Sequence, residues 1–206
     1  MAMSRSGGTL PVLDLDGERV VDSTRIIKAL ERRTPDPALY PADPEERRRA
    51  LELEDFFDEN AGHDMRRVGF WELRDDRSGI SDFLGTDQGA GTRVMIRAMM
   101  PVAWPYIKRR YDFTEEEFQR SRDTLVTALD RIESERAGRE HLVGDSFTVA
   151  DLAGAALLFP LAWPAELQYD HPDQPSEFTD SVKDHPSVAW IRDTYRRHRG
   201  TSAEVR

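Results

Sequence analysis

The stretch that decides the fold runs from His141 to Trp163 and reads HLVGDSFTVADLAGAALLFPLAW. Between Val149 and Trp163 the only charged or hydrogen-bonding side chain is that of Asp151. A helix that is apolar on every side is a buried helix, and this one is too short to span a bilayer. We therefore expect it to lie in the core of a helical domain.

The residues before this helix predict where it begins. Thr148 is expected at the N-cap, and Asp151, three residues later, can accept a hydrogen bond from the N–H of the cap residue. Phe147 precedes the cap and is placed to pack on Leu152 as a hydrophobic staple. The sequence therefore assigns Thr148 and Asp151 a structural role in capping this helix.

Residues 144–152, GDSFTVADL, resemble the capping motif of the buried helix in the glutathione S-transferase superfamily. A Ser/Thr-x-x-Asp cap is common by itself, but cap, staple, preceding Gly-Asp and all-apolar helix together are more specific. In that family the motif is a folding element. The resemblance implies a mostly α fold: an all-helical C-terminal-type bundle preceded by a partial thioredoxin-like segment.

Composition excludes several classes of function for this chain of 206 residues. The formal net charge of −10 argues against nucleic acid as the main partner. The chain has no cysteine, so it offers no disulfide, no thiolate nucleophile and no thiolate metal ligand. The N-terminus lacks the apolar segment of a signal peptide, and no apolar run is long enough to cross a membrane. We expect a cytoplasmic protein with no membrane partner.

The N-terminal residues predict a β-hairpin and one helix. Residues 10–15 alternate like a short strand, Asp16-Gly17 is a strong hairpin-turn signal, and residues 18–21 form the return strand. Ser23 is expected to cap the helix that follows. A proline-rich run then predicts a linker, which gives the division into a partial thioredoxin-like segment (1–33), a linker (34–42) and a helical domain (43–206).

The rest of the chain is expected to be helical. Asp43-Pro44-Glu45-Glu46 is a typical helix start, and that helix is predicted to continue toward Trp71. A second helical stretch, over 92–110, is expected to be interrupted by Pro101 and Pro105. Further helices are predicted over 115–138, 176–183 and 187–198.

The family resemblance extends to the hairpin and the start of its helix, and it implies a glutathione site. In the family the proline that corresponds to Pro11 is cis and exposes the backbone of the preceding residue, Leu10, to the cysteinyl part of glutathione. The acidic-Ser pair, here Asp22-Ser23, binds the γ-glutamyl end. A helix N-terminus with a hydroxyl suits a carboxylate, and Asp22 can pair with an ammonium group. Without the resemblance, Ser23 reads as an ordinary cap and Pro11 as a strand-edge proline.

The chain departs from the family before Leu10. A complete member has a strand, a helix, a strand and a helix there, with the catalytic Tyr, Ser or Cys after the first strand. The first half of the thioredoxin-like domain is therefore expected to be missing, and no catalytic residue is predicted. Either that half is encoded in frame upstream of Met1, or the open edge of the strand after Pro11 is covered by a partner chain or left disordered.

Three aromatic residues are candidates for a hydrophobic substrate pocket. The family builds its second-substrate site from the first two helices of the helical domain, which here carry Trp71, Trp104 and Tyr106. Ordinary core packing is the alternative for each of them. The five histidines show no metal-ligand spacing, so no metal site is predicted.

Three functions remain open at this point. The first is a glutathione S-transferase-family enzyme that conjugates a thiol to a small hydrophobic electrophile. Glutathione, or another low-molecular-weight thiol, would be the cosubstrate, with no covalently bound cofactor, and a homodimer is expected. The second is a non-catalytic binding or interaction module of the same fold, since the catalytic segment is absent. The third is a helical protein that sequesters hydrophobic ligands without a thiol.

Overall fold

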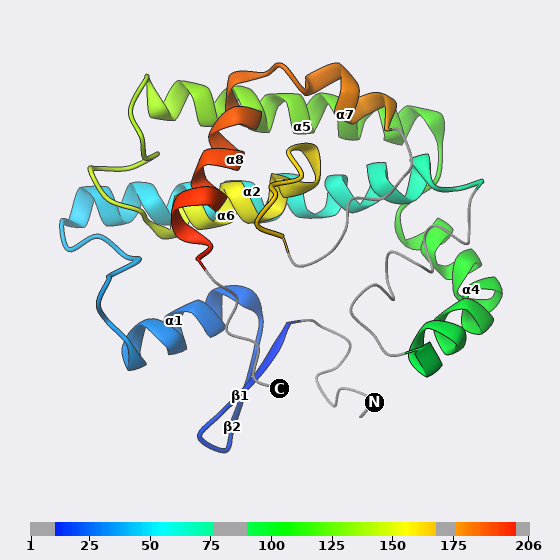
Figure 1. Cartoon of the computed structure of the whole chain (residues 1–206), viewed down its shortest axis with the longest axis horizontal. Coiled ribbons are helices and arrows are strands. Elements are labelled where there is room, and N and C mark those ends of the chain that lie inside the picture. Colours follow the sequence, from blue (N-terminus) through cyan, green and yellow to red (C-terminus); the bar gives the residue numbers. More distant parts are fainter. Residues whose placement is uncertain (1–10, 76–89, 168–175, 201–206) are drawn as a thin grey trace.

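The computed structural model describes residues 11–75, 90–167 and 176–200. Its elements in chain order are β1 (Val12–Leu15), β2 (Glu18–Val21), α1 (Ser23–Arg33), α2 (Pro44–Glu72), α4 (Ala90–Arg110), α5 (Glu115–Arg136), α6 (Val149–Leu158), the 3₁₀ turn η1 (Phe159–Leu161), α7 (Glu177–Val182) and α8 (Pro186–His198). The described part of the chain is mostly helical, with one hairpin at its N-terminal end that lies below the helices in Figure 1, and this confirms the predicted fold class.

The hairpin forms where the sequence predicts it. β1 and β2 pair antiparallel, with Val12 opposite Val21 and Leu15 opposite Glu18. Asp16 and Gly17 both have positive φ, 52° and 85°, as a tight two-residue hairpin turn requires. In the part of the chain that the structure describes, β1 pairs with β2 and with no other strand, so its second edge has no strand beside it.

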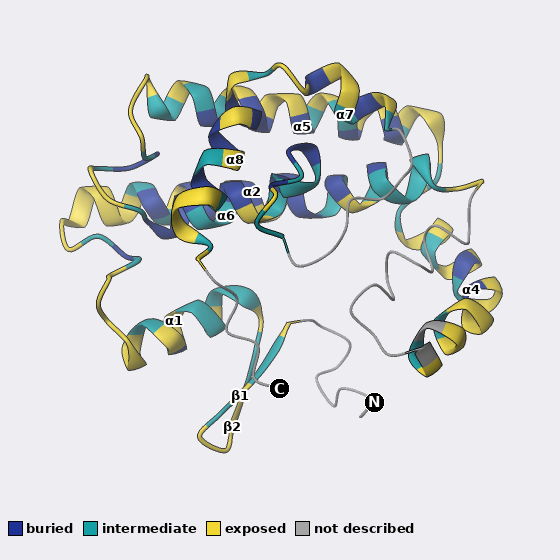
Figure 2. Cartoon of the chain, viewed as in Figure 1, coloured by how far each residue is buried: buried dark blue, intermediate teal, exposed yellow. Residues whose placement is uncertain are grey.

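The core lies among α2, α5, α6 and α8. Figure 1 shows α5 along one side of the bundle, α2 and α6 side by side, and α8 crossing them. Buried residues gather on the facing sides of these helices, whereas α1 and α4 at the two ends are more exposed (Figure 2). The largest fully buried side chains come from this bundle and its connections: Leu53, Phe57, Val68, Leu125, Leu129, Ile132, Leu142, Leu158, Leu161, Phe178 and Ile191.

The apolar helix α6 packs mainly on α2, but it is not buried on every side. Val149, Ala150, Asp151, Gly154, Ala155 and Leu158 are buried. On the opposite side Leu152, Ala153 and Leu157 are half-buried, and Ala156 is exposed. The prediction of a core helix is therefore right for one face, and the composition alone did not reveal that the other face is only partly covered.

α6 approaches α2 closely because Gly154 has no side chain. A Cβ at this position would lie 3.2 Å from Cε2 of Phe57, which is tighter than ordinary van der Waals contact. Phe57 is fully buried. A glycine and a large ring thus interlock at the centre of the bundle.

Helix α4 corrects one expectation about prolines. It continues from Ala90 to Arg110 with Pro101 and Pro105 inside it, whereas an interruption was predicted. Both prolines are exposed. Because they lie on the solvent side, water can bind the carbonyl groups whose helical hydrogen bonds the prolines remove.

None of the helices within the described ranges is both long enough and apolar enough to cross a membrane.

Candidate functional site

The hairpin register brings the predicted glutathione-site residues to one end of the sheet. Val12 pairs with Val21, so Pro11, just before β1, lies beside Asp22, just after β2. Ser23 then opens α1. Leu10 lies outside the described residues, and so does its peptide bond to Pro11. The hairpin, whose register follows from its two-residue turn, therefore places Pro11, Asp22 and Ser23 together.

Asp22, and not Ser23, is the N-cap of α1. Its Oδ1 accepts a hydrogen bond of 3.2 Å from the N–H of Arg25, and Ser23 is the first helical residue. Both residue types make good caps, so the sequence alone does not decide between them. The backbone of Asp22 has φ 82°, a region that non-glycine residues rarely adopt, and such strain is concentrated at functional sites.

The start of α1 offers groups that suit a zwitterionic ligand. The first N–H groups of a helix have no partner within the helix. In α1 these groups include the N–H of Ser23 and the N–H of Thr24, which precede the Arg25 N–H that Asp22 caps. Together with the Ser23 hydroxyl and the positive end of the helix dipole, they favour a carboxylate. The exposed carboxylate of Asp22 lies next to them and favours a cation.

The site end of α1 is anchored to the helical bundle. The hydroxyl of Thr24 donates a hydrogen bond of 2.9 Å to Oε1 of Glu54 on α2. Glu54 is only 3% exposed, and burial raises the pKa of its carboxyl above the usual value, although the Thr24 hydrogen bond and Lys28 oppose the shift. This contact holds Ser23, one residue earlier, in a defined position relative to α2.

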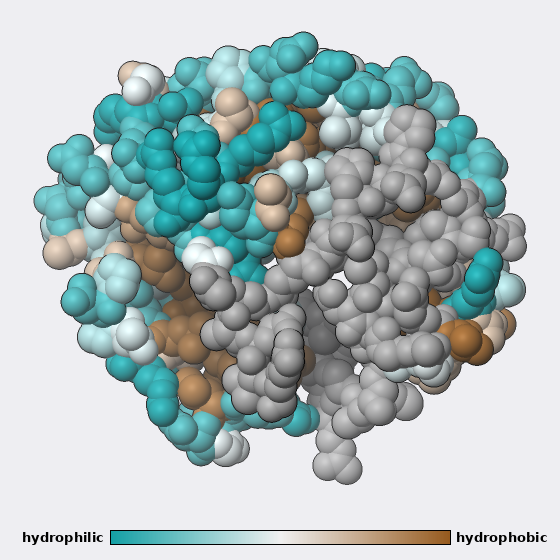
Figure 3. All heavy atoms as spheres, viewed as in Figure 1, coloured by the Kyte–Doolittle hydropathy of each residue, from teal (hydrophilic) through white to brown (hydrophobic). Residues whose placement is uncertain are grey.

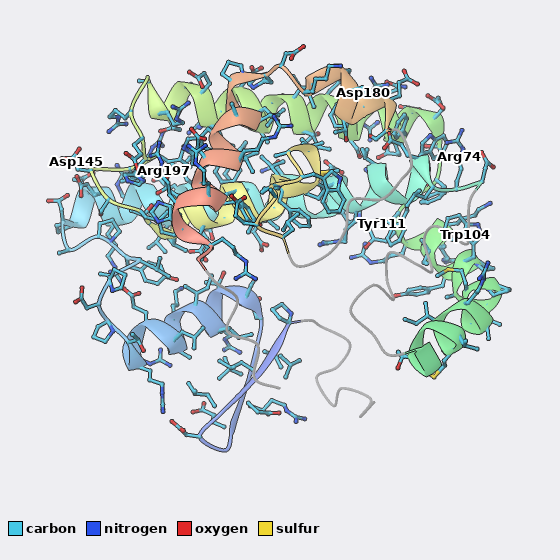
Figure 4. All side chains as sticks on the ribbon, in the orientation of Figure 1. Arg74, Trp104, Tyr111, Asp145, Asp180 and Arg197 are labelled. Atoms are coloured by element: carbon cyan, nitrogen blue, oxygen red, sulfur yellow. The ribbon has the colours of Figure 1, made fainter. Side chains whose placement is uncertain are left out.

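The predicted aromatic residues fall into two environments. Trp71 stacks on Phe118 with ring centroids 5.3 Å apart, and it meets Phe113 edge-on at 5.7 Å. Trp104, 3% exposed, also packs edge-on against Phe113, at 5.5 Å. Figure 4 shows Trp104 where α4 faces the rest of the bundle. The structure thus joins Trp71 and Trp104 through one phenylalanine.

Tyr106 does not share that environment. Its side chain is on α4 as well, but the residue is 69% exposed. It follows Trp104 by two positions, which turns it toward a different side of the helix.

Thr148 and Asp151 lie in the core as a folding element. Both are buried, and Oδ2 of Asp151 accepts hydrogen bonds of 2.9 Å from the N–H and from the hydroxyl of Thr148. Oδ1 accepts another of 2.9 Å from the N–H of Leu142. The Asp151 half of the predicted cap is therefore present, and Asp151 also fastens the preceding loop. Phe147, predicted to pack on Leu152, stacks its ring on His198 at 4.2 Å.

The structure brings together one group of possible metal ligands that the sequence did not predict. Glu140, His141 and His198 converge at a pocket of about 290 Å³ between α8 and the loop that follows α5. They could hold a metal ion, because one donor atom from each lies within 4.8 Å of the others. His141 and His198 are far apart in the sequence, so no spacing rule links them.

Comparison with known protein families gives a match for the helical part of the chain. Residues 95–184 match the family model of the glutathione S-transferase C-terminal domain. A search of curated proteins gave no significant match.

Two of the solved structures that match this chain are bacterial proteins of the same fold. One is a glutathione S-transferase from Methylobacterium radiotolerans in complex with glutathione sulfonate, 20% identical with a TM-score of 0.53, covering 96% of this chain and 75% of the other. The second is the β-etherase LigF from Sphingobium sp. strain SYK-6, 21% identical with a TM-score of 0.59, covering 89% of this chain and 72% of the other. At these identities the structural matches show a shared fold alone.

Proposed function

Because residues 95–184 match the family model of the glutathione S-transferase C-terminal domain, we propose that this chain is a member of that superfamily. We propose that it binds glutathione, or a similar low-molecular-weight thiol, at the start of α1 and conjugates it to a small hydrophobic electrophile. The observation that carries the proposal is the strained Asp22 at the N-cap, beside Pro11 and followed by Ser23. The related transferase from M. radiotolerans was solved with glutathione sulfonate, which supports a ligand of this class.

Each end of the γ-glutamyl group has a matching partner at this site. Its carboxylate would accept hydrogen bonds from the Ser23 hydroxyl and from N–H groups at the start of α1. Its ammonium group would pair with the Asp22 carboxylate. The cysteinyl part would lie toward Pro11 and the backbone of Leu10, as the family resemblance implies.

In the conjugation, the thiolate sulfur forms a bond to an electrophilic carbon and the leaving group departs with the bonding electrons. Half-buried Trp71, which packs against Phe113 and Phe118, is the proposed contact for the hydrophobic electrophile, whereas Trp104 is packed in the core and Tyr106 lies on the exposed side of α4. The group that stabilises the thiolate is not assigned. A non-catalytic binding module of the same fold is therefore the alternative, because no Tyr, Ser or Cys of this chain is assigned the catalytic role.

We expect Ser23→Ala to weaken glutathione binding by about 10- to 100-fold, because a hydrogen bond to a charged group contributes about 1.5–3 kcal/mol. Isothermal titration calorimetry of the full chain measures the change. Ser146→Ala is the matched control, since Ser146 is an exposed serine in the loop before α6. Equal affinities for wild type and Ser23→Ala would remove the site assignment.

Asp22→Asn separates the charge of Asp22 from its capping role. Asparagine caps helices about as well as aspartate, so α1 should keep its start while the partner of the ammonium group is lost. Binding of glutathione should weaken, whereas binding of an analogue without the amino group should not change. In an assay with an aryl halide, thiol-dependent release of halide supports the enzyme, and thiol binding without release supports the binding module.

We further propose that the chain forms a homodimer through α4. Met95, Met99, Val102 and Tyr106 are spaced four, three and four residues apart, and their exposed fractions range from 43% to 83%. This spacing places them in one stripe on the helix, as in helix–helix seams. Figure 3 shows hydrophobic atoms at the surface over α4. A second copy of the chain would cover the stripe with an identical one.

Val102→Glu is expected to convert the dimer into a monomer, because it places a charge in the middle of the apolar stripe. Size-exclusion chromatography with light scattering should give twice the chain mass of 23.6 kDa for wild type and the single mass for the variant. Val126→Glu is the control, since Val126 is an exposed valine on α5. A wild-type protein that is monomeric would contradict the proposal.

The remaining assignments follow from the family. We propose that residues 1–33 form the glutathione-binding segment, 34–42 the linker and 43–206 the helical domain, and the matched range 95–184 lies within the last of these. We propose the cytoplasm as the location, where glutathione and similar thiols are abundant.

A further inference from the structure

We propose that Glu140, His141 and His198 form a binding site for a divalent transition-metal ion. Glu140 and His141 lie in the loop between α5 and α6, and His198 is the last residue of α8. One donor atom from each lies within 4.8 Å of the other two. The three residues line the pocket together with Trp190 and Asp193, among others. None of them belongs to the proposed glutathione site.

The donor set suits zinc and its neighbours in the periodic table. Two imidazole nitrogens and one carboxylate oxygen are typical ligands of Zn²⁺, Co²⁺ and Ni²⁺. In a tetrahedral zinc site, bonds of about 2.0–2.1 Å place the donor atoms about 3.3 Å apart. The three donors must therefore draw closer by up to about 1.5 Å. The Glu140 side chain is 54% exposed and already lies 3.7 Å from His141, so it can adjust by a change of rotamer, while the two histidine rings must also move toward each other.

His141 is oriented for metal binding by the residues around it. Its Nε2 lies 3.7 Å from Oε1 of Glu140, on the side of the proposed site. Its Nδ1 lies 3.8 Å from Oδ1 of the buried Asp151. A carboxylate hydrogen-bonded to the second ring nitrogen is the usual arrangement for a metal-binding histidine. At 3.8 Å the Asp151 carboxylate lies on the correct side of the ring but beyond hydrogen-bond distance, so the ring must move slightly toward it when a metal binds. Asp151 is itself held by the N–H groups of Leu142 and Thr148.

His198 approaches from the opposite side on α8. Its ring stacks on Phe147 with centroids 4.2 Å apart and an interplanar angle of 23°, which limits its rotation. Its centroid lies 5.9 Å from that of His141.

Glu140 can leave its present partner without leaving a charge unpaired. It forms an ion pair with Arg197, which projects from α8 toward this loop (Figure 4). Arg197 has a second carboxylate within reach, since Oδ2 of Asp193 lies 4.0 Å from its Nη2. When Glu140 turns to the metal, Arg197 can therefore pair with Asp193. Three protein ligands would leave the fourth position open toward the pocket.

The test is metal binding by the full chain after removal of any affinity tag and treatment with a chelator. Titration with Co²⁺, followed by visible absorption, and calorimetry with Zn²⁺ are expected to show one equivalent bound. His141→Ala and His198→Ala should each lower the affinity by about 100-fold or more, and Glu140→Gln by about 10-fold or more. His63→Ala, on α2, is the matched control and should bind as wild type does.

The metal titrations of the variants decide whether the site exists. Binding of one equivalent that is lost in His198→Ala and kept in His63→Ala supports the site. Absence of binding, or binding that His141→Ala and His198→Ala leave unchanged, overturns it. Because His198 is exposed, His198→Ala is expected to fold even if His141→Ala does not, and circular dichroism checks this for each variant. The result is independent of glutathione affinity, so the metal site and the proposed function can fail separately.

Discussion

Asp151→Ala is expected to destabilise the folded protein by about 3 kcal/mol or more, because it leaves the buried N–H groups of Leu142 and Thr148 without acceptors, each at about 1–3 kcal/mol. Asp151 is completely buried and accepts hydrogen bonds from both groups and from the Thr148 hydroxyl. The effect should exceed that of an ordinary N-cap, about 1 kcal/mol, since the carboxylate also fastens the loop before α6.

Urea denaturation monitored by circular dichroism measures the change in the free energy of unfolding. Asp145→Ala is the matched control, because Asp145 is an exposed aspartate in the same loop (Figure 4). The control should unfold within about 0.5 kcal/mol of wild type, as surface substitutions usually do. If Asp151→Ala unfolded at the same urea concentration as wild type, the capping role of Asp151 would be wrong.

Phe57→Ala is expected to destabilise the protein by about 3–5 kcal/mol, the range for removing a fully buried aromatic ring. Phe57 lies on α2 opposite Gly154 of α6, and its ring fills the space that a side chain at 154 would need. The loss combines the transfer free energy of the ring with the cavity left where α2 and α6 meet.

The contact between Phe57 and Gly154 predicts that the effect of Gly154→Ala on the free energy of unfolding changes sign when Phe57 is replaced by alanine. In wild type, Gly154→Ala should destabilise the protein, because the new methyl group lies 3.2 Å from the ring. In the Phe57→Ala background the same change should be stabilising, because the methyl group enters vacated space and alanine favours a helix over glycine by about 1 kcal/mol. Identical effects of Gly154→Ala in both backgrounds would show that the two residues do not interlock.

The helix starts could be predicted from the sequence because each cap depends on residues that are close together along the chain. Asp43, at the start of α2, accepts hydrogen bonds of 3.0 Å from the N–H groups of Glu45 and Glu46, and Thr114 accepts one of 3.2 Å from Glu117 at the start of α5. Each cap joins residues two or three positions apart, so the sequence contains both partners. At α1 the sequence offered two adjacent caps, Asp22 and Ser23, and the turn out of β2 selected the first.

Side-chain burial was less predictable than helix position. Trp104 and Tyr106 are both aromatic and two residues apart on α4, yet one is 3% and the other 69% exposed. Which side of α4 faces the bundle depends on its contacts with Phe113 and its neighbours, and the hydrophobic residues of α4 lie on more than one side of the helix. The substrate-pocket prediction for these residues therefore could not be refined from the sequence.

By itself, the sequence determined the hairpin at Asp16-Gly17, the apolar helix from Val149 and the Asp151 cap, since each depends on backbone and side-chain chemistry within a few residues. Only the tertiary structure decided that Leu142 shares the Asp151 carboxylate and that His198 meets His141. Those contacts join segments whose separation along the chain carries no information about distance, and they form because packing α6 and α8 against α2 and α5 removes apolar surface from water.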